Sequence, residues 1–196
     1  MKWKELSNDK VIKDNLCFVR YEKMLINELE NVLSEYIIKP ITEENIEDVF
    51  HLMKSNKYFY SKTQNHEVTI EECLEDIDAL PPRVEKSKKT FVALYDKNKC
   101  LAVIDFIEGY PREDIGYLGL LMLDESIQRK GMGKKILTNI FKVARNKKFK
   151  IIELACYETN ENGFAFWTKM GFVEVRKSER ETDGKIYNLI SMQYRL

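Results

Sequence analysis

The sequence is poor in the residues that build metal sites and disulfide bonds. It has only two histidines and four cysteines, and no two cysteines form a C-x-x-C pair. Zinc sites are built from closely spaced cysteine and histidine ligands, so no metal cofactor is expected. Because the cysteines lie far apart along the chain, we expect reduced core residues of an intracellular protein.

Long apolar runs and an excess of one charge are also missing. No stretch is long and apolar enough to cross a bilayer, and the first residues contain no apolar run typical of a signal peptide. The expected location is therefore the cytoplasm, with no membrane partner. The 32 Lys and Arg residues balance the 32 Asp and Glu residues. Binders of nucleic acid usually carry a basic excess, so no nucleic-acid partner is expected.

The most informative stretch is an apolar strand followed by a basic, glycine-rich loop. Leu118–Leu123 is a nearly continuous apolar run, which predicts a strand buried on both faces. The glycines behind it allow backbone N–H groups to approach a ligand, and the next helix directs its positive dipole end to the same place. Such an arrangement suits a pyrophosphate. The residues expected to hold it are Arg129, Lys130, Gly131, Met132, Gly133 and Lys134.

Two short motifs give the chain a family resemblance. QRKGMG, residues 128–133, resembles the Q/R-x-x-G-x-G/A signature of the GNAT superfamily of N-acetyltransferases, whose backbone amides hold the pyrophosphate of acetyl-CoA. NENGFAFWTKMGF, residues 160–172, resembles the N-x-x-A-x-x-F-[YW]-x-K-x-G-F block of that family. Because the motifs occur in the family's order and spacing, the chain is identified as a member over about residues 36–196. The resemblance implies an acyltransferase with acetyl-CoA as co-substrate.

The hydrophobic pattern predicts an α/β fold, a mixed sheet with helices on both faces. The expected order is β-α-α-β-β-β-α-β-α-β-β, consistent with the GNAT architecture. Strands are expected at 36–41, 90–95, 100–107, 118–123, 151–156, 172–176 and 186–195. Residues 1–35 precede this domain as an N-terminal extension. Its apolar residues predict a helix from about Arg20 to Ser34 that packs on the domain or forms a dimer contact.

For the co-substrate, the resemblance implies a cleft between two parallel strands that splay apart at their carboxyl ends. These strands are Leu118–Leu123 and Ile151–Cys156. The pantetheine arm of CoA would pair with the free backbone of Leu121, Met122 and Leu123. A backbone N–H near Met122 would then stabilise the oxyanion of the thioester carbonyl.

Three further residues bear on CoA binding and on departure of the thiolate. Asn162 matches a family position that hydrogen-bonds CoA, and its place also suits a helix cap. Trp167 stands where many family members have a tyrosine that protonates the leaving sulfur. Indole cannot serve as that acid at neutral pH, so Trp167 is expected to pack against the pantetheine or in the core. Tyr157, just past its strand, is a candidate for supplying the proton instead.

A carboxylate that deprotonates the acceptor amine is the remaining requirement. The candidates are Asp105 and Glu108, on or after the strand at 100–107, and Glu153 in the strand at 151–156. Asp105 interrupts the apolar run AVIDFI, where partial desolvation would raise the pKa of its carboxyl. An outward-facing polar residue explains the same pattern at Asp105 and at Glu153.

The acceptor itself is not named by the sequence. Tyr58, Phe59 and Tyr60 are adjacent aromatics, and they are expected to wall the acceptor site or to pack under a loop. The leading hypothesis is transfer of an acetyl group to the amine of a small molecule. Acetylation of a protein or peptide is the alternative within the enzyme class, and a non-catalytic sensor of acyl-CoA is the alternative outside it. A homodimer is compatible with all three.

Overall fold

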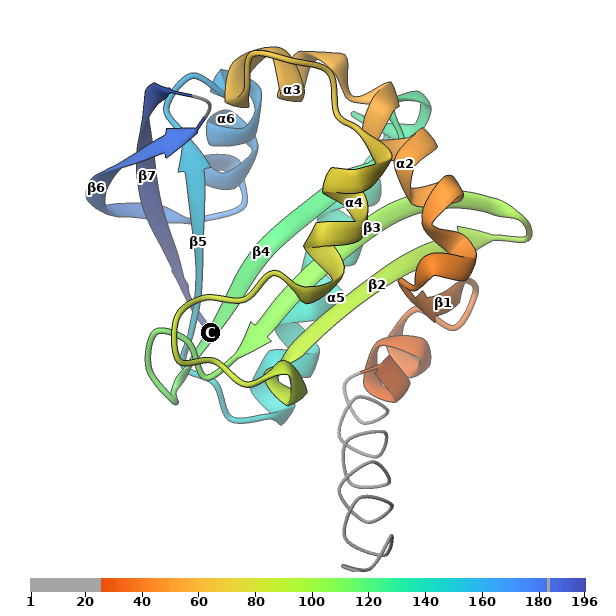
Figure 1. Cartoon of the computed structure of the whole chain (residues 1–196). Helices are drawn as coiled ribbons and strands as arrows, with labels where there is room; N and C mark the ends of the chain where they lie inside the picture. Colours follow the sequence, from red (N-terminus) through yellow and green to blue (C-terminus); the bar gives the residue numbers. More distant parts are fainter. Residues whose placement is uncertain (1–25, 183) are drawn as a thin grey trace, which may run out of the picture.

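A computed structural model describes residues 26–182 and 184–196 of the chain. One seven-stranded sheet runs through it in the order β1-β2-β3-β4-β5-β7-β6 (Figure 1). All neighbouring strands are antiparallel except β4 and β5. The strands are β1 (Ile37–Pro40), β2 (Lys89–Asp96), β3 (Lys99–Glu108), β4 (Ile115–Leu123), β5 (Ile151–Tyr157), β6 (Val173–Thr182) and β7 (Lys185–Arg195). This is the mixed sheet that the sequence predicts.

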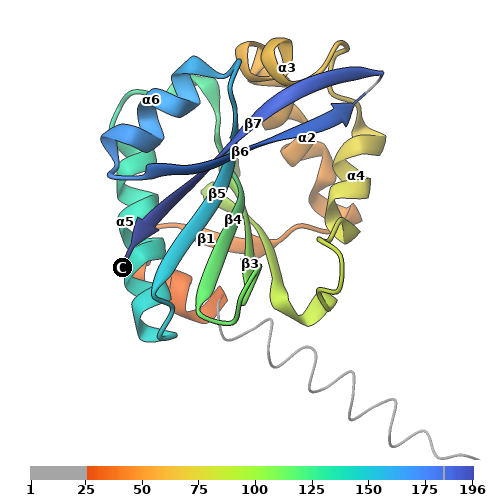
Figure 2. The same cartoon turned by 90° about the vertical axis from the view of Figure 1, so that its left-hand side faces the viewer.

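Helices cover both faces of the sheet, which confirms the predicted α/β class. Figure 2 shows α2, α3 and α4 on one side of the strands and α5 and α6 on the other. Their bounds are α2 (Ile46–Ser55), α3 (Lys57–Thr63), α4 (Ile70–Asp78), α5 (Met132–Asn146) and α6 (Glu161–Lys169). Residues 26–32 are helical as well, within the helix expected at 20–34. The first part of that expected helix, residues 20–25, lies outside the described residues.

Alternation along the strands divides the core into two apolar layers. Residues such as Leu94 and Ile104 pack with the buried face of α5. Their neighbours Ala93 and Val103 point the other way and pack with α2 and α4. The face on which any strand residue lies can therefore be read from its position in this alternation. We call the two sides of the sheet the α5 face and the α2–α4 face.

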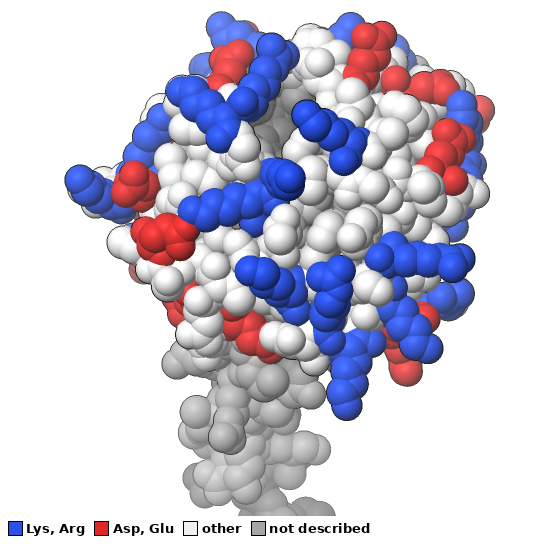
Figure 3. Space-filling model, turned by 180° about the vertical axis from the view of Figure 1, so that it is seen from behind, with Lys and Arg blue, Asp and Glu red and all other residues white. Residues whose placement is uncertain are grey.

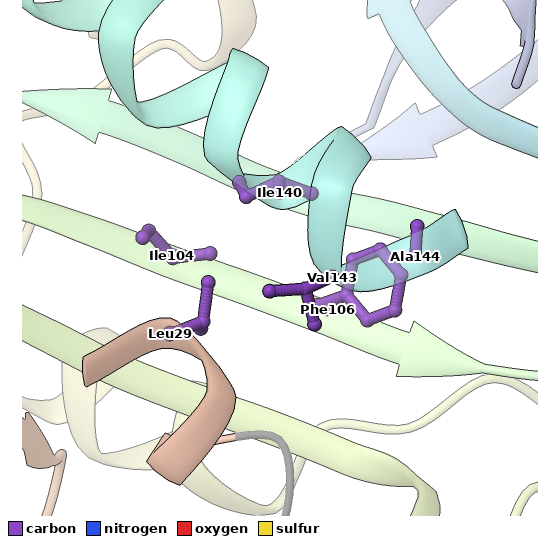
Figure 4. Close-up of a pocket in the computed structure, with 6 residues that line it drawn as sticks. All are labelled: Leu29, Ile104, Phe106, Ile140, Val143 and Ala144. Atoms are coloured by element: carbon purple, nitrogen blue, oxygen red, sulfur yellow. The ribbon is translucent and has the colours of Figure 1, made fainter. Parts of the chain in front are cut away.

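Residues 26–33 close the α5 layer over β3. Leu29 and Leu33 are buried in the same apolar cluster as the residues of α5. Figure 4 shows Leu29 facing β3 and α5 across a cavity of about 10 Å³. Its lining is entirely apolar: Leu29, Ile104, Phe106, Ile140, Val143 and Ala144. A space of this size without polar partners stays dry, so this cavity is a packing gap in the core.

One difference from the sequence prediction lies between α2 and α4. The sequence predicts one helix through Ser55, another from Thr69 and a loop between them, but that stretch contains α3, and the break between α2 and α3 falls at Asn56. The Asn56 amide group donates to the carbonyl oxygen of Leu52 at 2.9 Å, which satisfies the end of α2. The segment Thr69-Ile70-Glu71-Glu72 has the sequence of a capping box, which predicts a helix start, and Thr69 and Glu72 form that box at the beginning of α4.

Candidate active site

The two parallel strands at the centre of the sheet separate along their length. β4 and β5 are paired only at Ile115–Ile151, Gly116–Ile152 and Tyr117–Glu153. Both strands then continue, β4 to Leu123 and β5 to Tyr157. The splay that the resemblance implies is therefore present. Leu121 and Leu123 are only half-buried and Gly119 is exposed, so the prediction of a strand buried on both faces is wrong at the carboxyl end of β4.

The direction of the backbone groups of β4 follows from its pairing with β3. Asp124 donates its N–H to the carbonyl oxygen of Leu101 at 2.9 Å. Since successive residues of an antiparallel strand face alternate sides, Met122 points its N–H and C=O toward Val103, its partner on β3. Leu121 and Leu123 point theirs toward the open side. The carbonyl of Leu123 already accepts from the Gln128 and Asn56 side chains, each at 3.0 Å.

The glycine-rich loop joins this open strand edge to the beginning of α5. Gly131 is the N-cap of α5 and has a φ of 85°, a conformation that favours glycine. A Cβ on Gly131 would meet no atom of residues 26–182 and 184–196 within 4 Å, so among these residues the space in front of it is open. At Gly133 a Cβ would lie 3.2 Å from the Phe166 ring, so that glycine lets α5 approach α6 closely. The loop thus presents unpaired N–H groups to an open space.

Positive charge surrounds the same loop. Arg129, Lys130 and Lys134 are exposed, and no Asp or Glu occurs between Gln128 and Lys150. Figure 3 views the molecule from the α5 side and shows Lys and Arg side chains spread over that face. Helix dipole, free N–H groups and side-chain charges therefore all favour an anion at the beginning of α5.

The second motif forms α6 and packs it against the core. Asn160 caps the helix, its side-chain oxygen accepting from the N–H of Gly163 at 3.1 Å. Asn162 lies in the first turn of the helix and is exposed. The cap is thus the asparagine that opens the motif, and Asn162 does not cap. The Trp167 ring contacts those of Phe166 and Phe172, with centroids 4.8 and 5.5 Å apart.

Asp105 lies on the α2–α4 face, beside the open part of β4. β4 has a bulge at Gly119, so Asp105 pairs with Leu120 and the next β3 residue pairs with Leu118. The Asp105 side chain is 18% exposed, and its Oδ2 atom lies 3.4 Å from Nζ of Lys89. Its Oδ1 atom is buried and has no hydrogen-bond partner among the described residues. Burial raises the pKa of Asp105 to about 6, although attraction by Lys89 opposes the shift.

The other two carboxylates proposed as bases are occupied. Glu108 lies on the opposite, α5 face, where it forms an ion pair with Lys147 at 3.0 Å. Glu153 is on the same face as Asp105 but is buried, and both of its oxygens accept hydrogen bonds. The donors are Arg176 at 3.2 Å and Gln193 at 2.7 Å. Of the three candidates, Asp105 is therefore the one that is partly buried, lies beside the unpaired part of β4 and has an oxygen atom without a hydrogen-bond partner among the described residues.

The predicted aromatic residues lie around the same face. Tyr58 is exposed on α3, while Phe59 and Tyr60 are half-buried and meet edge to face at 5.2 Å between centroids. Tyr157, at the end of β5, meets Tyr187 edge to face at 5.6 Å. The three aromatics of α3 are thus divided between solvent and packing against the core of the α2–α4 face, and only Tyr58 is largely exposed.

Three residues of the site were missed by the sequence reasoning. Lys89 is the first residue of β2, and its side chain contacts Asp105. A single lysine at the start of an apolar strand gave no reason to expect this contact. Asn56 links α2 to β4. The third is Thr159, whose hydroxyl group donates to the carbonyl oxygen of Lys62 in α3 at 2.6 Å. Contacts over such sequence separations leave no local pattern.

The described residues offer neither a metal cluster nor a membrane span. They contain no group of three or more His, Cys, Asp or Glu side chains placed to hold a metal ion. Among the same residues, no helix has the length and apolar character that a membrane span requires.

Comparisons with known proteins match the fold and the motifs. The family model described as "Acetyltransferase (GNAT) family" matches residues 46–172. An acetyltransferase from Thermus thermophilus is 20% identical, with a TM-score of 0.63 over 82% of this chain and 97% of that one. A Salmonella typhimurium acetyl transferase that modifies the N-terminal serine of ribosomal protein L7/L12 is 16% identical, with a TM-score of 0.67 over 84% and 97%. The Escherichia coli ribosomal-protein-S18-alanine N-acetyltransferase is 14% identical, with a TM-score of 0.57 over 82% and 93%.

The family match spans more than half of the chain and includes both the glycine-rich loop and α6. The structural neighbours share the sheet and its helices at identities that by themselves indicate the fold alone. Acyl transfer, with acetyl-CoA as the co-substrate that the family implies, follows from the membership. The chain belongs to the GNAT family of acetyltransferases.

Proposed function

We propose that this protein transfers an acetyl group directly from acetyl-CoA to the amine of a small molecule. The observation that carries the proposal is the early end of the β4–β5 pairing, after Tyr117 and Glu153. It leaves a backbone edge open between an anion-binding loop on one side and a half-buried carboxylate, Asp105, on the other. Donor, acceptor and base can thereby meet at one place.

The donor would lie along the open edge of β4. Its pyrophosphate fits the unpaired N–H groups of Gly131, Met132, Gly133 and Lys134, with Arg129 and Lys130 adding charge. The pantetheine arm would pair with the backbone groups of Leu121 and Leu123 that face the open side, apart from the Leu123 carbonyl, which accepts from Asn56 and Gln128. The role of oxyanion donor, expected near Met122, moves to the N–H of Leu121, because the Met122 N–H is directed toward β3. For Asn162, exposed near the beginning of α6, a hydrogen bond to CoA remains a proposal.

The chemistry requires a neutral amine, a stabilised oxyanion and a departing thiolate. Asp105 would take the proton from the acceptor ammonium group, directly or through a water molecule, so that the nitrogen lone pair can attack the thioester carbon. The C–N bond forms, the oxyanion rests on the Leu121 N–H, and collapse breaks the C–S bond while the nitrogen releases its second proton to water. A thiol with a pKa of about 8.5 leaves tolerably as the thiolate, and Tyr157 is the candidate donor of its proton. Trp167 serves packing in this scheme.

A small acceptor is favoured by the position of α3. Asn56, just before α3, binds the end of β4 through the Leu123 carbonyl. Near the other end of α3, the Lys62 carbonyl accepts from Thr159, just after β5. The helix therefore spans the wide end of the cleft from one strand to the other, which narrows the approach for a peptide chain. It also brings Tyr58, Phe59 and Tyr60 near the wide end of the cleft, where the exposed Tyr58 would contact an apolar or cationic group of the acceptor and the other two would support it.

A peptide amine is the second candidate acceptor. The observation in its favour is that two structural neighbours, from Salmonella typhimurium and Escherichia coli, are named for acetylation of ribosomal proteins. Those identities are low, and the position of α3 in this chain argues for the small molecule. The two acceptors can be compared in one assay.

The deciding experiment measures CoA release by thiol detection with acetyl-CoA in excess. Polyamines, aminoglycosides, amino acids and short peptides would be tested at equal concentration. We expect turnover with a small amine that exceeds turnover with every peptide. Faster turnover with a peptide would favour the second candidate, and binding of acetyl-CoA without turnover on any amine would favour a sensor.

A further inference from the structure

Lys89 is a buried lysine beside the proposed base. Its side chain is only 3% exposed, and its Nζ atom lies 3.4 Å from Oδ2 of Asp105. The same ammonium group donates to the carbonyl oxygens of Asp76, at 2.5 Å, and Ala79, at 2.7 Å, where α4 ends. It also lies 4.9 Å from the centre of the Phe91 ring. A buried charge persists only when it is paired and hydrogen-bonded, and here every partner belongs to the α2–α4 face.

The contacts of Lys89 join the end of α4 to the proposed base on β3. The end of α4 has carbonyl groups that no helical N–H can satisfy, and Lys89 supplies donors for two of them. The same ammonium group also contacts the Asp105 carboxylate on β3. One side chain therefore ties the end of α4 to the carboxylate that would receive the proton.

Other groups near Asp105 do not replace this contact. From β4 it faces the uncharged residues Gly119 and Leu120. From α4 the nearby charge is Asp76, a carboxylate, which raises the pKa of Asp105 by repulsion. Arg180 on β6 interacts electrostatically with Asp76. Among the described residues whose charges act on Asp105 itself, Lys89 is the one that favours the charged form of the carboxyl.

We propose that Lys89 is a positioning residue for acetyl transfer. Its ammonium group contacts Oδ2 of Asp105 and keeps the carboxylate ionised, ready to take the proton of the acceptor at the exposed 18% of the side chain. The inference rests on the proposed role of Asp105 as the base. Without the lysine charge, a carboxyl in this buried position holds its proton more tightly and works as a base only at higher pH.

The test compares Lys89→Met with a matched control, Lys147→Met. Lys147 also forms a half-buried ion pair with a carboxylate, Glu108, but on the α5 face. Titration of the aspartate carboxyl groups by ¹³C NMR, with Asp105→Asn to assign the signal, measures the Asp105 midpoint without any acceptor. We expect Lys89→Met to raise this midpoint by one pH unit or more, since an opposite charge shifts a carboxyl pKa by about 1–3 units. Lys147→Met should leave it unchanged.

The pH–rate profile gives the functional readout, using the amine of the panel with the fastest CoA release. We expect the acid limb of kcat/KM to move to higher pH in Lys89→Met, in parallel with the NMR midpoint. At pH 7 this corresponds to a rate loss of about tenfold for a midpoint near 8. Lys89→Arg, which keeps the charge, should restore most of the profile. If Lys89→Met does not fold, Lys89→Gln removes the charge and retains an amide donor for α4.

The outcomes separate the two proposals. An unchanged midpoint and an unchanged acid limb in the folded Lys89 variant would overturn the inference, even if Asp105→Asn were inactive. Full activity of Asp105→Asn, with the wild-type acid limb, would instead overturn the role of Asp105. In that case the difference in the Asp105 midpoint between the wild type and Lys89→Met would still show whether Lys89 acts on this carboxyl.

Discussion

The Oδ2 atom of Asp105 lies directly beneath Gly119 of the neighbouring strand. A Cβ on Gly119 would be 2.9 Å from that oxygen, closer than two such atoms pack. The glycine sits in the bulge of β4, which adds a residue opposite Asp105 and bends the strand. The same glycine therefore gives the carboxylate its space and helps β4 to turn away from β5.

We expect Gly119→Ala to lower kcat by about tenfold or more while leaving acetyl-CoA binding within a factor of about three. The added methyl group must displace the carboxylate from Lys89 or shift the bulge. Steady-state kinetics measure kcat, and a thermal shift with acetyl-CoA reports binding. The double variant with Asp105→Asn provides the control. If the glycine acts through Asp105, the two losses are non-additive, and fully additive losses would contradict this explanation.

Activity should fall as the pH is lowered through about 6. The folded-state pKa of Asp105 is raised to about 6 by burial, so below that value the carboxyl is protonated and cannot accept a proton from the amine. The acid limb of kcat/KM for the best amine should therefore have its midpoint near 6. Asp105→Asn should lower kcat/KM by about 10²–10⁴ and abolish this limb. A midpoint near 4, typical of an exposed aspartate, would disagree with the buried geometry.

The sequence predicted the fold well because its strongest signals are local. Apolar alternation, the capping box at Thr69 and the glycines at 131 and 133 each act through neighbours within a few residues. The order of helices and strands along the chain agrees with the architecture of the family that the two motifs resemble. No helix is predicted at 57–63, where three adjacent aromatics cannot share one buried face, yet the segment forms α3, in which Phe59 and Tyr60 pack against the core of the α2–α4 face and Tyr58 is exposed.

The site was predictable only in part, since its polar partners come from distant positions. Asp105 was a candidate on its apolar neighbours alone, and nothing in the sequence separated it from Glu108. The separation depends on which face of β3 each residue occupies. Asp105 faces α4 and Lys89, while Glu108 faces Lys147 after α5. Likewise, the choice between the N–H groups of Leu121 and Met122 requires the register of β3 and β4.

Glu108→Gln should affect stability more than catalysis. The variant weakens the half-buried contact with Lys147 by removing its negative charge, and we expect the free energy of unfolding to fall by about 1 kcal/mol. The value of kcat should stay within a factor of about two. Urea denaturation and CoA release measure the two quantities. A loss of kcat comparable to that of Asp105→Asn would make Glu108 a candidate base again.

Trp167→Ala should likewise act on stability. Its ring packs against Phe166 and Phe172 and belongs to the border of the α5-face core. Full burial of a tryptophan is worth about 3–5 kcal/mol on truncation, and we expect about 2–3 kcal/mol for this half-buried ring. Trp167→Tyr tests the catalytic alternative, because it restores the hydroxyl group that many family members have. We expect no gain in kcat from it, and a gain of several-fold would mean that thiolate departure limits the rate.

Binding of acetyl-CoA offers the most direct test of the loop at the beginning of α5. Arg129 and Lys148 are both exposed basic residues with positive φ, 58° and 65°, but they lie at opposite ends of α5, about 20 Å apart along the helix. Replacing either by alanine removes one charge at a similar backbone conformation. If the pyrophosphate lies on Gly131 and Gly133, Arg129→Ala should weaken acetyl-CoA binding by about tenfold, and more at low salt than at high salt. Lys148→Ala should change it by less than about twofold, and equal effects of the two variants would mean that only the overall charge of the face matters.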